Sequence, residues 1–125
     1  MVNYQSFLNA IKQDIEMVRG DTLLFNFQLA GLGELSAYED LEVLFAVAEH
    51  YDDTSVIEIT KENGVELESY DSATDTALFS VSVAPSYTKV MGLDRYYYDL
   101  QIKDTSFNVI TLMRGRLTLL WDVAD

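Results

Sequence analysis

The chain contains no cysteine and only one histidine among its 125 residues. Without cysteine it can form neither a disulfide nor a thiolate metal site. The single histidine, His50, cannot complete a zinc or iron site by itself. A hydrolytic triad would depend on the same residue, and no nucleophile-elbow motif accompanies it. We therefore expect no enzymatic activity, no cofactor and no metal centre.

Basic residues are scarce as well. Eight Lys and Arg stand against 21 Asp and Glu, which gives a net charge of −13. Binding to phosphates requires a basic surface, and an anionic membrane repels an acidic chain. We therefore expect no direct nucleic-acid partner and no membrane partner. The acidic residues have two interpretations: they keep the protein soluble, or they mimic a polyanion.

Long apolar runs are also missing. No segment reaches the roughly 20 apolar residues that span a bilayer, and the first residues do not follow the pattern of a signal peptide. We expect a chain that is used in a cytoplasm or built into a particle there. Its length and its 49% hydrophobic residues predict one domain, residues 1–125, with a core of its own.

The clearest pattern in the chain is an alternation of apolar and polar residues. In residues 95–103 the apolar positions are Tyr96, Tyr98, Leu100 and Ile102, and in residues 116–123 they are Leu117, Leu119, Trp121 and Val123. A period of two predicts a strand with one buried face. We therefore expect Trp121 in the core, and a Trp121→Ala variant that is less stable by about 3–5 kcal/mol.

Other segments add short strands at intervals of about ten residues. We expect them at 14–17, 22–29, 41–49, 55–61, 65–70, 76–83 and 109–114. Asn63-Gly64 predicts a type I′ hairpin between two of these strands. Pro85 should end a strand, and Gly115 should form a bulge or tight turn before the last one. The pattern indicates an all-β fold, an antiparallel β-sandwich (Ig-like or jelly-roll-like) of about eight strands.

The N-terminal residues follow a helical spacing instead. The apolar residues Tyr4, Phe7, Leu8, Ile11 and Ile15 would lie on one helix face. This predicts a short helix over about residues 3–12, within an N-terminal arm of residues 1–13.

Several apolar residues fall on the outward register of their strands. They are Leu24, Leu44, Tyr97 and Leu120. Repeated apolar residues on an outer face suggest a second covered surface. Either the N-terminal helix or a neighbouring subunit would cover it. Together with Tyr4, Phe7, Leu8 and Ile11, these residues are the candidate interface.

Three short motifs have a functional and a structural interpretation. Arg19-Gly20-Asp21 spells a tripeptide that integrins recognise, but it also reads as an ordinary turn. His50 lies near Asp52 and Asp53, and Asp71–Asp75 and Glu39-Asp40 offer oxygens to calcium. Because the ligand spacing of an EF-hand is absent, we favour solvated loops and turns for all of them.

The closing segment, RYYYDLQIKD…TLMRGRLTLLWDV, resembles small β-sandwich modules of bacteriophage virions, such as the N-terminal domain of baseplate upper proteins. The matching residues are Gly20-Asp21-Thr22, Tyr96–Asp99, Thr111-Leu112, Gly115 and Asp122-Val123. The resemblance implies a structural protein of the virion, made in a bacterial cytoplasm, which binds copies of itself and other virion proteins. It carries over no catalytic residue.

Members of that family usually continue into a stalk or receptor-binding region. A chain that stops at Asp125 fits a connector, a tail or baseplate adaptor, or a head-decoration subunit better. The alternative function is a small acidic inhibitor that mimics DNA and blocks a host nucleic-acid-binding protein, although the acids are scattered over turns and strand ends. A sugar-binding sandwich would depend on an exposed Tyr97 and on loop acids.

Overall fold

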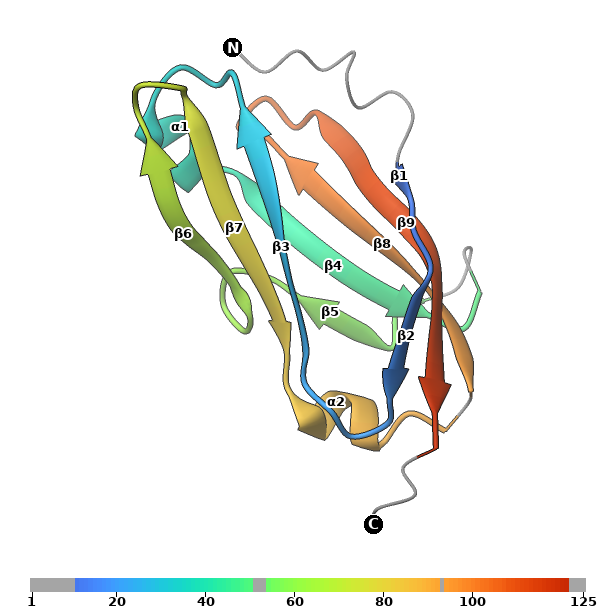
Figure 1. Cartoon of the computed structure of the whole chain (residues 1–125). Coiled ribbons are helices and arrows are strands. Elements are labelled where there is room, and N and C mark those ends of the chain that lie inside the picture. The colour runs from blue at the N-terminus through green and yellow to red at the C-terminus, as the bar shows by residue number, and fades with distance from the viewer. Residues whose placement is uncertain (1–10, 51–53, 93, 122–125) are drawn as a thin grey trace.

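The protein is a two-layered β-sandwich, seen in a computed structural model that describes residues 11–50, 54–92 and 94–121 (Figure 1). The strands are β1 (Ile11–Lys12), β2 (Ile15–Val18), β3 (Leu23–Ala30), β4 (Glu42–Ala48), β5 (Ile57–Ile59), β6 (Val65–Asp71), β7 (Thr76–Val83), β8 (Arg95–Lys103) and β9 (Val109–Leu120). Two short helices, α1 (Leu35–Glu39) and α2 (Pro85–Lys89), lie between strands. The all-β prediction is confirmed. Among the described residues, neither helix is long enough to cross a bilayer.

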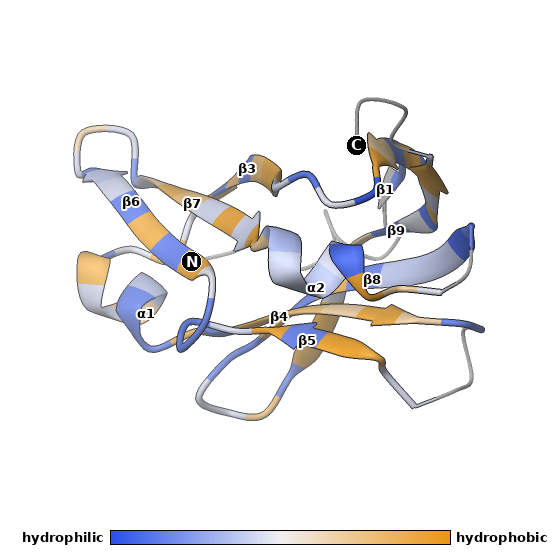
Figure 2. Cartoon of the chain, turned by 90° about the horizontal axis from the view of Figure 1, so that it is seen from below, coloured by the Kyte–Doolittle hydropathy of each residue, from blue (hydrophilic) through white to orange (hydrophobic). Residues whose placement is uncertain are grey.

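The strands form one large and one small sheet. The large sheet has the order β1-β9-β8-β4-β5, and β2 also pairs with β9; the small sheet has the order β3-β7-β6. Figure 2 shows the two layers edge-on, with β1 and β9 curving up on the side next to β3. All neighbours are antiparallel except β1 and β2, which run parallel to β9. The predicted sandwich therefore has one parallel edge that the sequence pattern did not reveal.

The predicted N-terminal helix is wrong where it can be examined. Ile11–Lys12 is a strand that pairs with Met113 and Arg114. Ile15 belongs to β2, opposite Leu117, which confirms the strand predicted at 14–17. Residues 3–10 lie outside the described part of the chain, as does the side chain of Ile11.

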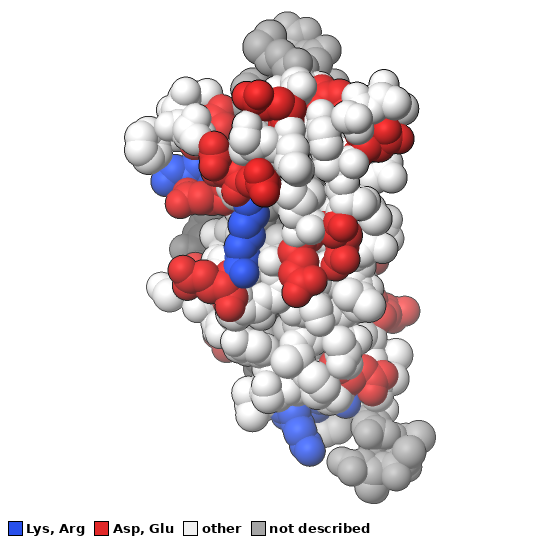
Figure 3. All heavy atoms as spheres, turned by 90° about the vertical axis from the view of Figure 1, so that its left-hand side faces the viewer, with Lys and Arg blue, Asp and Glu red and all other residues white. Residues whose placement is uncertain are grey.

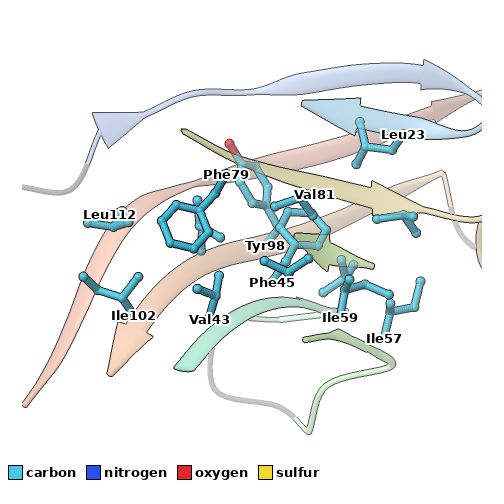
Figure 4. Close-up of a cluster of buried hydrophobic side chains, with 14 of the residues drawn as sticks. Leu23, Val43, Phe45, Ile57, Ile59, Phe79, Val81, Tyr98, Ile102 and Leu112 are labelled. Atoms are coloured by element: carbon cyan, nitrogen blue, oxygen red, sulfur yellow. The ribbon is translucent and has the colours of Figure 1, made fainter. Parts of the chain in front are cut away.

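The core lies between the sheets and is centred on aromatic side chains (Figure 4). The ring of Phe45 from β4 lies 5.5 Å from that of Tyr98 and 5.4 Å from that of Phe25, measured between centroids. Tyr96 and Tyr98 are buried and Tyr97 is half-buried on the other side of β8. The predicted orientation of the three tyrosines is therefore confirmed.

Trp121 is not in the core, and its predicted burial is wrong. Its side chain is 71% exposed, and the Arg19 guanidinium lies 4.9 Å from the ring centroid. Leu117 and Leu119, on the same register, are buried. Strand β9 ends at Leu120, so Trp121 lies just past the sandwich and meets no facing sheet.

Two turn predictions are also wrong. Strand β5 pairs with β4 in the large sheet and β6 pairs with β7 in the small one, so Asn63-Gly64 connects the layers and closes no hairpin. Neither residue has the positive φ that a type I′ turn requires. Gly115 lies inside the continuous strand β9, opposite Tyr98, and forms no turn; the register shift between β8 and β9 falls between Leu100 and Gln101, so Gly115 is not the bulge either.

A polar cluster around Asp75 fixes the end of the sandwich near α1. The Asp75 carboxylate accepts hydrogen bonds from the Gly33 N–H (2.8 Å) and from the hydroxyls of Tyr38 and Tyr70 (both 3.0 Å). Burial alone would raise the pKa of Asp75, but these bonds outweigh it and lower the pKa. The ionised carboxylate therefore links α1 to the β6–β7 turn.

Candidate functional site

A hollow lies on the outer face of the large sheet, where β1, β8 and β9 meet. It is open, has a volume of about 500 Å³, and is lined by Lys12, Asp14, Tyr97, Arg114, Gly115 and Arg116. We call this surface the basic hollow, because three of the eight basic residues of the chain line it. The hollow contains Tyr97, which the sequence pattern predicted as an interface residue, and three cations that the sequence pattern did not predict there.

The parallel edge of the sheet builds the basic hollow. Lys12 pairs in register with Arg114, and Arg114 and Arg116 lie on one side of β9 because they are two residues apart. Gly115 permits the segment between β1 and β2 to lie close to β9. A Cβ at this position would overlap the carbonyl oxygen of Gln13 and lie 2.7 Å from its carbon.

Two ion pairs orient the arginines of the basic hollow. The guanidinium of Arg116 lies 3.3 Å from the Asp14 carboxylate, and that of Arg114 lies 3.7 Å from Asp99. The pKa of Asp14 is lowered, first by the hydrogen bond from the main-chain N–H of Arg116 and then by that from its side chain. Lys12 is exposed, and among the described residues it has no ion-pair partner. The hollow therefore holds more positive than negative charge.

The second candidate surface is the outer edge of β3, which we call the β3 edge. The N–H of Gly31 donates to the carbonyl of Asp75. In an antiparallel pair, every second residue of a strand bonds to the partner strand, and the residues between them point their main-chain groups away from it. Odd-numbered residues of β3 therefore bond to β7, and the main-chain groups of Leu24, Asn26, Gln28 and Ala30 point away from it. Within the described part of the chain, these four amides have no hydrogen-bond partner.

The β3 edge differs in composition from the other edge of its sheet. Strand β3 reads LLFNFQLA, with no charged residue and no proline. Strand β6, at the opposite edge, reads VELESYD, with three acidic residues. Charged side chains commonly keep an edge strand from pairing with other chains. The small sheet thus has one protected edge and one unprotected edge.

The predicted interface residues whose side chains the structure describes lie on four different strands. Leu24, on β3, is 65% exposed and Leu120, at the end of β9, is 45% exposed. Leu44 and Tyr97 are half-buried on the outer face of the large sheet, where Leu44 is opposite Gln101 and Tyr97 is opposite Ala48. Tyr4, Phe7 and Leu8 lie outside the described residues, and of Ile11 only the main chain is described.

The short motifs have structural environments. In Arg19-Gly20-Asp21, the Arg19 side chain is only 12% exposed; its guanidinium donates to the Met91 carbonyl and lies 3.2 Å from Asp94. The Asp21 N–H donates to the Val18 carbonyl, which closes a turn. The Arg19 side chain of this tripeptide is thus engaged in contacts within the fold.

The proposed oxygen ligands are engaged in similar local contacts. Asp71 accepts a bond from the Ala73 N–H (2.9 Å), and the ring of His50 lies 6.5 Å from that of Tyr97. Among the residues that the structure describes, no three His, Asp or Glu side chains are placed to hold a metal. Asp52 and Asp53 lie outside that part of the chain.

Sequence reasoning missed Lys12, Arg114 and Arg116. One signal was available, because Arg114 and Arg116 have the spacing of two residues on one strand face. Their meeting with Lys12 depends on a parallel pairing between the two ends of the chain, which no local pattern encodes.

Comparisons with known proteins give little. No family model matches the chain, and no curated protein matches it. Among solved structures, the chain is similar to AggA, the major subunit of aggregative adherence fimbriae type I from Escherichia coli. The sequence identity is 12% and the TM-score is 0.44, over 89% of this chain and 91% of that one. We draw no functional conclusion from this likeness.

Proposed function

We propose that this chain is a non-enzymatic structural subunit that functions by protein–protein assembly. The resemblance of its closing strands makes a bacteriophage particle the setting that we expect, as a tail, baseplate, connector or head-decoration subunit. Its partners would be copies of itself and other virion proteins. The β3 edge is the observation that supports this proposal most.

The β3 edge is suited to accept a strand from another chain. Four outward-pointing residues offer main-chain donors and acceptors, and such groups give affinity in strand addition. Leu24, exposed at the start of the strand, adds an apolar contact. Although the protein has a net charge of −13, all eight residues of this edge strand are uncharged, so a partner strand meets no charged side chain of β3.

A charge placed on the β3 edge tests this proposal. Gln28→Lys should block strand addition, since lysine protects natural edge strands. Ser69→Lys makes the same charge change on β6, at the opposite edge of the sheet, and serves as the control. Sedimentation velocity at ~0.5 M salt, where the screening length is roughly 4 Å, should show assembly of the wild type and of Ser69→Lys but not of Gln28→Lys.

Two results would count against the proposal. Assembly of Gln28→Lys like that of the wild type would show that the β3 edge is not the interface. A wild-type protein that stays monomeric at all concentrations, and that binds no other virion protein, would refute the assembly function itself.

A DNA-mimicking inhibitor is the alternative, and one acidic face favours it. Figure 3 shows acidic side chains spread over the side of the molecule formed by β6 and α1. The exposed acids of these elements and of the turns beside them include Glu39, Asp40, Glu62, Glu66, Glu68 and Asp71. Lys61 interrupts this set, with its amine 2.8 Å from the Glu39 carbonyl oxygen. The alternative requires binding to a basic host protein that weakens steeply between ~0.05 and ~0.5 M salt.

A further inference from the structure

The basic hollow concentrates positive charge in a chain that has little of it. Lys12, Arg114 and Arg116 line it, and Asp14 is the one acidic residue among the lining residues that the structure describes. A concave surface lined mainly by one sign of charge attracts the opposite sign more strongly than scattered charges do. The hollow therefore has the charge that suits carboxylates or other anions.

The arrangement of the cations suits an acidic protein surface. Arg116 is held by Asp14, but a guanidinium has five N–H donors and one carboxylate does not occupy them all. Lys12 extends into solvent beside it. Tyr97 adds an aromatic ring from β8. Separate donors and an open shape fit several carboxylates spread over a surface better than one small ion enclosed in a pocket.

We propose that the basic hollow binds the acidic β6 strand of a second copy of this chain. Glu66 and Glu68 lie on β6 and are exposed. The hollow lies at the β1–β9 side of the large sheet, whereas β6 is an outer strand of the small sheet, on the far side from β3. One copy can thus offer the hollow to one neighbour and β6 to another. Such a head-to-tail contact builds rings or filaments.

This contact would add a second interface to the proposed assembly, and the inference depends on that assembly function. The β3 edge would supply a contact that resists salt, since it is uncharged. The basic hollow would supply a second contact that salt weakens, because exposed charges are screened within about 10 Å at 0.1 M salt. The hollow would then select the neighbour and its orientation, which is the usual contribution of charge complementarity.

Charge reversal at Lys12 tests the inference. Lys12→Glu removes an exposed cation that has no ion pair in the described structure. Lys89→Glu makes the same change in net charge and is the control, because Lys89 is exposed at the end of α2 and does not line the hollow. Sedimentation velocity at ~0.05 M salt should show association of Lys12→Glu weakened roughly two- to fivefold, the scale of an exposed ion pair. Lys89→Glu should associate like the wild type.

A complementary variant adds a rescue. Glu66→Lys alone should weaken association, and Glu58→Lys controls for its charge, because Glu58 is exposed on β5 at the opposite edge of the large sheet from β1. Mixing Lys12→Glu with Glu66→Lys should restore a contact between the two variants. Equal weakening by Lys12→Glu and Lys89→Glu, or no rescue on mixing, would overturn the inference while leaving assembly through the β3 edge intact.

The same samples separate the inference from two other outcomes. A wild type that does not associate even at ~0.05 M salt would overturn the inference, and it would overturn the proposed function as well if the protein also binds no other virion protein. Fluorescence anisotropy with a single-stranded oligonucleotide of about 20 nucleotides tests a phosphate polyanion as the occupant. Binding of that oligonucleotide, lost on Lys12→Glu and without self-association, would assign the hollow to nucleic acid and overturn the inference.

Discussion

The carboxylate of Asp14 accepts two hydrogen bonds from Arg116, one from the main-chain N–H at 3.0 Å and one from the guanidinium at 3.3 Å. The two residues are 102 positions apart. Together with the Tyr98 hydroxyl, which donates to the Gln13 carbonyl, they hold the junction of β1 and β2 against β9. This junction positions the cations of the basic hollow.

Gly115→Ala should destabilise the protein, because the added Cβ meets the main chain of Gln13. We expect a loss of about 1–3 kcal/mol in the free energy of unfolding, the usual cost of overpacking, measured by urea denaturation. Gly92→Ala is the matched control, since a Cβ there meets nothing within 4 Å. Equal stability of the two variants would show that β1 and β2 do not need the close approach.

The sequence predicted the strands correctly where one face of a strand is buried and the other is exposed to solvent. In β8, Tyr96, Tyr98, Leu100 and Ile102 are all buried, as their alternation predicts. The helical prediction for residues 3–12 failed at Ile11 for a simple reason. Ile11 and Ile15 are four residues apart, and that interval returns to the same side in both a helix and a strand, so their spacing could not distinguish the two structures.

The remaining errors concern position along a strand and partner choice. Alternation placed Trp121 on the inner register but could not show that the facing sheet ends before it. Asn63-Gly64 marked a turn, but turn chemistry does not determine which sheet the next strand joins. The basic hollow needs Lys12 beside Arg114, a contact between the two ends of the chain that depends on the whole topology.

Stability should fall in acid because of Asp75. Its pKa is lowered in the folded protein, so it contributes stability above the unfolded value of about 3.9 and loses it as the pH falls through the folded pKa. Melting temperatures of the wild type should therefore fall as the pH drops below about 5 and through the folded pKa. Asp75→Asn should melt lower at pH 7 and show a shallower drop. An identical pH dependence in the variant would contradict this role of the carboxylate.

Trp121→Ala should change stability by less than ~1 kcal/mol, because the ring is 71% exposed and its main contact is the Arg19 guanidinium. Leu119→Ala, on the same register but buried, should cost about 2–5 kcal/mol. Urea denaturation of both variants provides the comparison. If Trp121→Ala lost as much free energy of unfolding as Leu119→Ala, the tryptophan would have to be buried in the core.

The most direct test of assembly through the β3 edge is residue-resolved amide hydrogen exchange in β3. In the monomeric Gln28→Lys variant, the amides of Leu24, Asn26 and Ala30 should exchange fast, while those of Phe25 and Phe27, bonded to β7, exchange slowly. In the assembled wild type, all of these amides should exchange slowly, because a partner strand then binds the outward-pointing groups. Fast exchange of Asn26 and Gln28 in the assembled wild type would contradict strand addition at this edge.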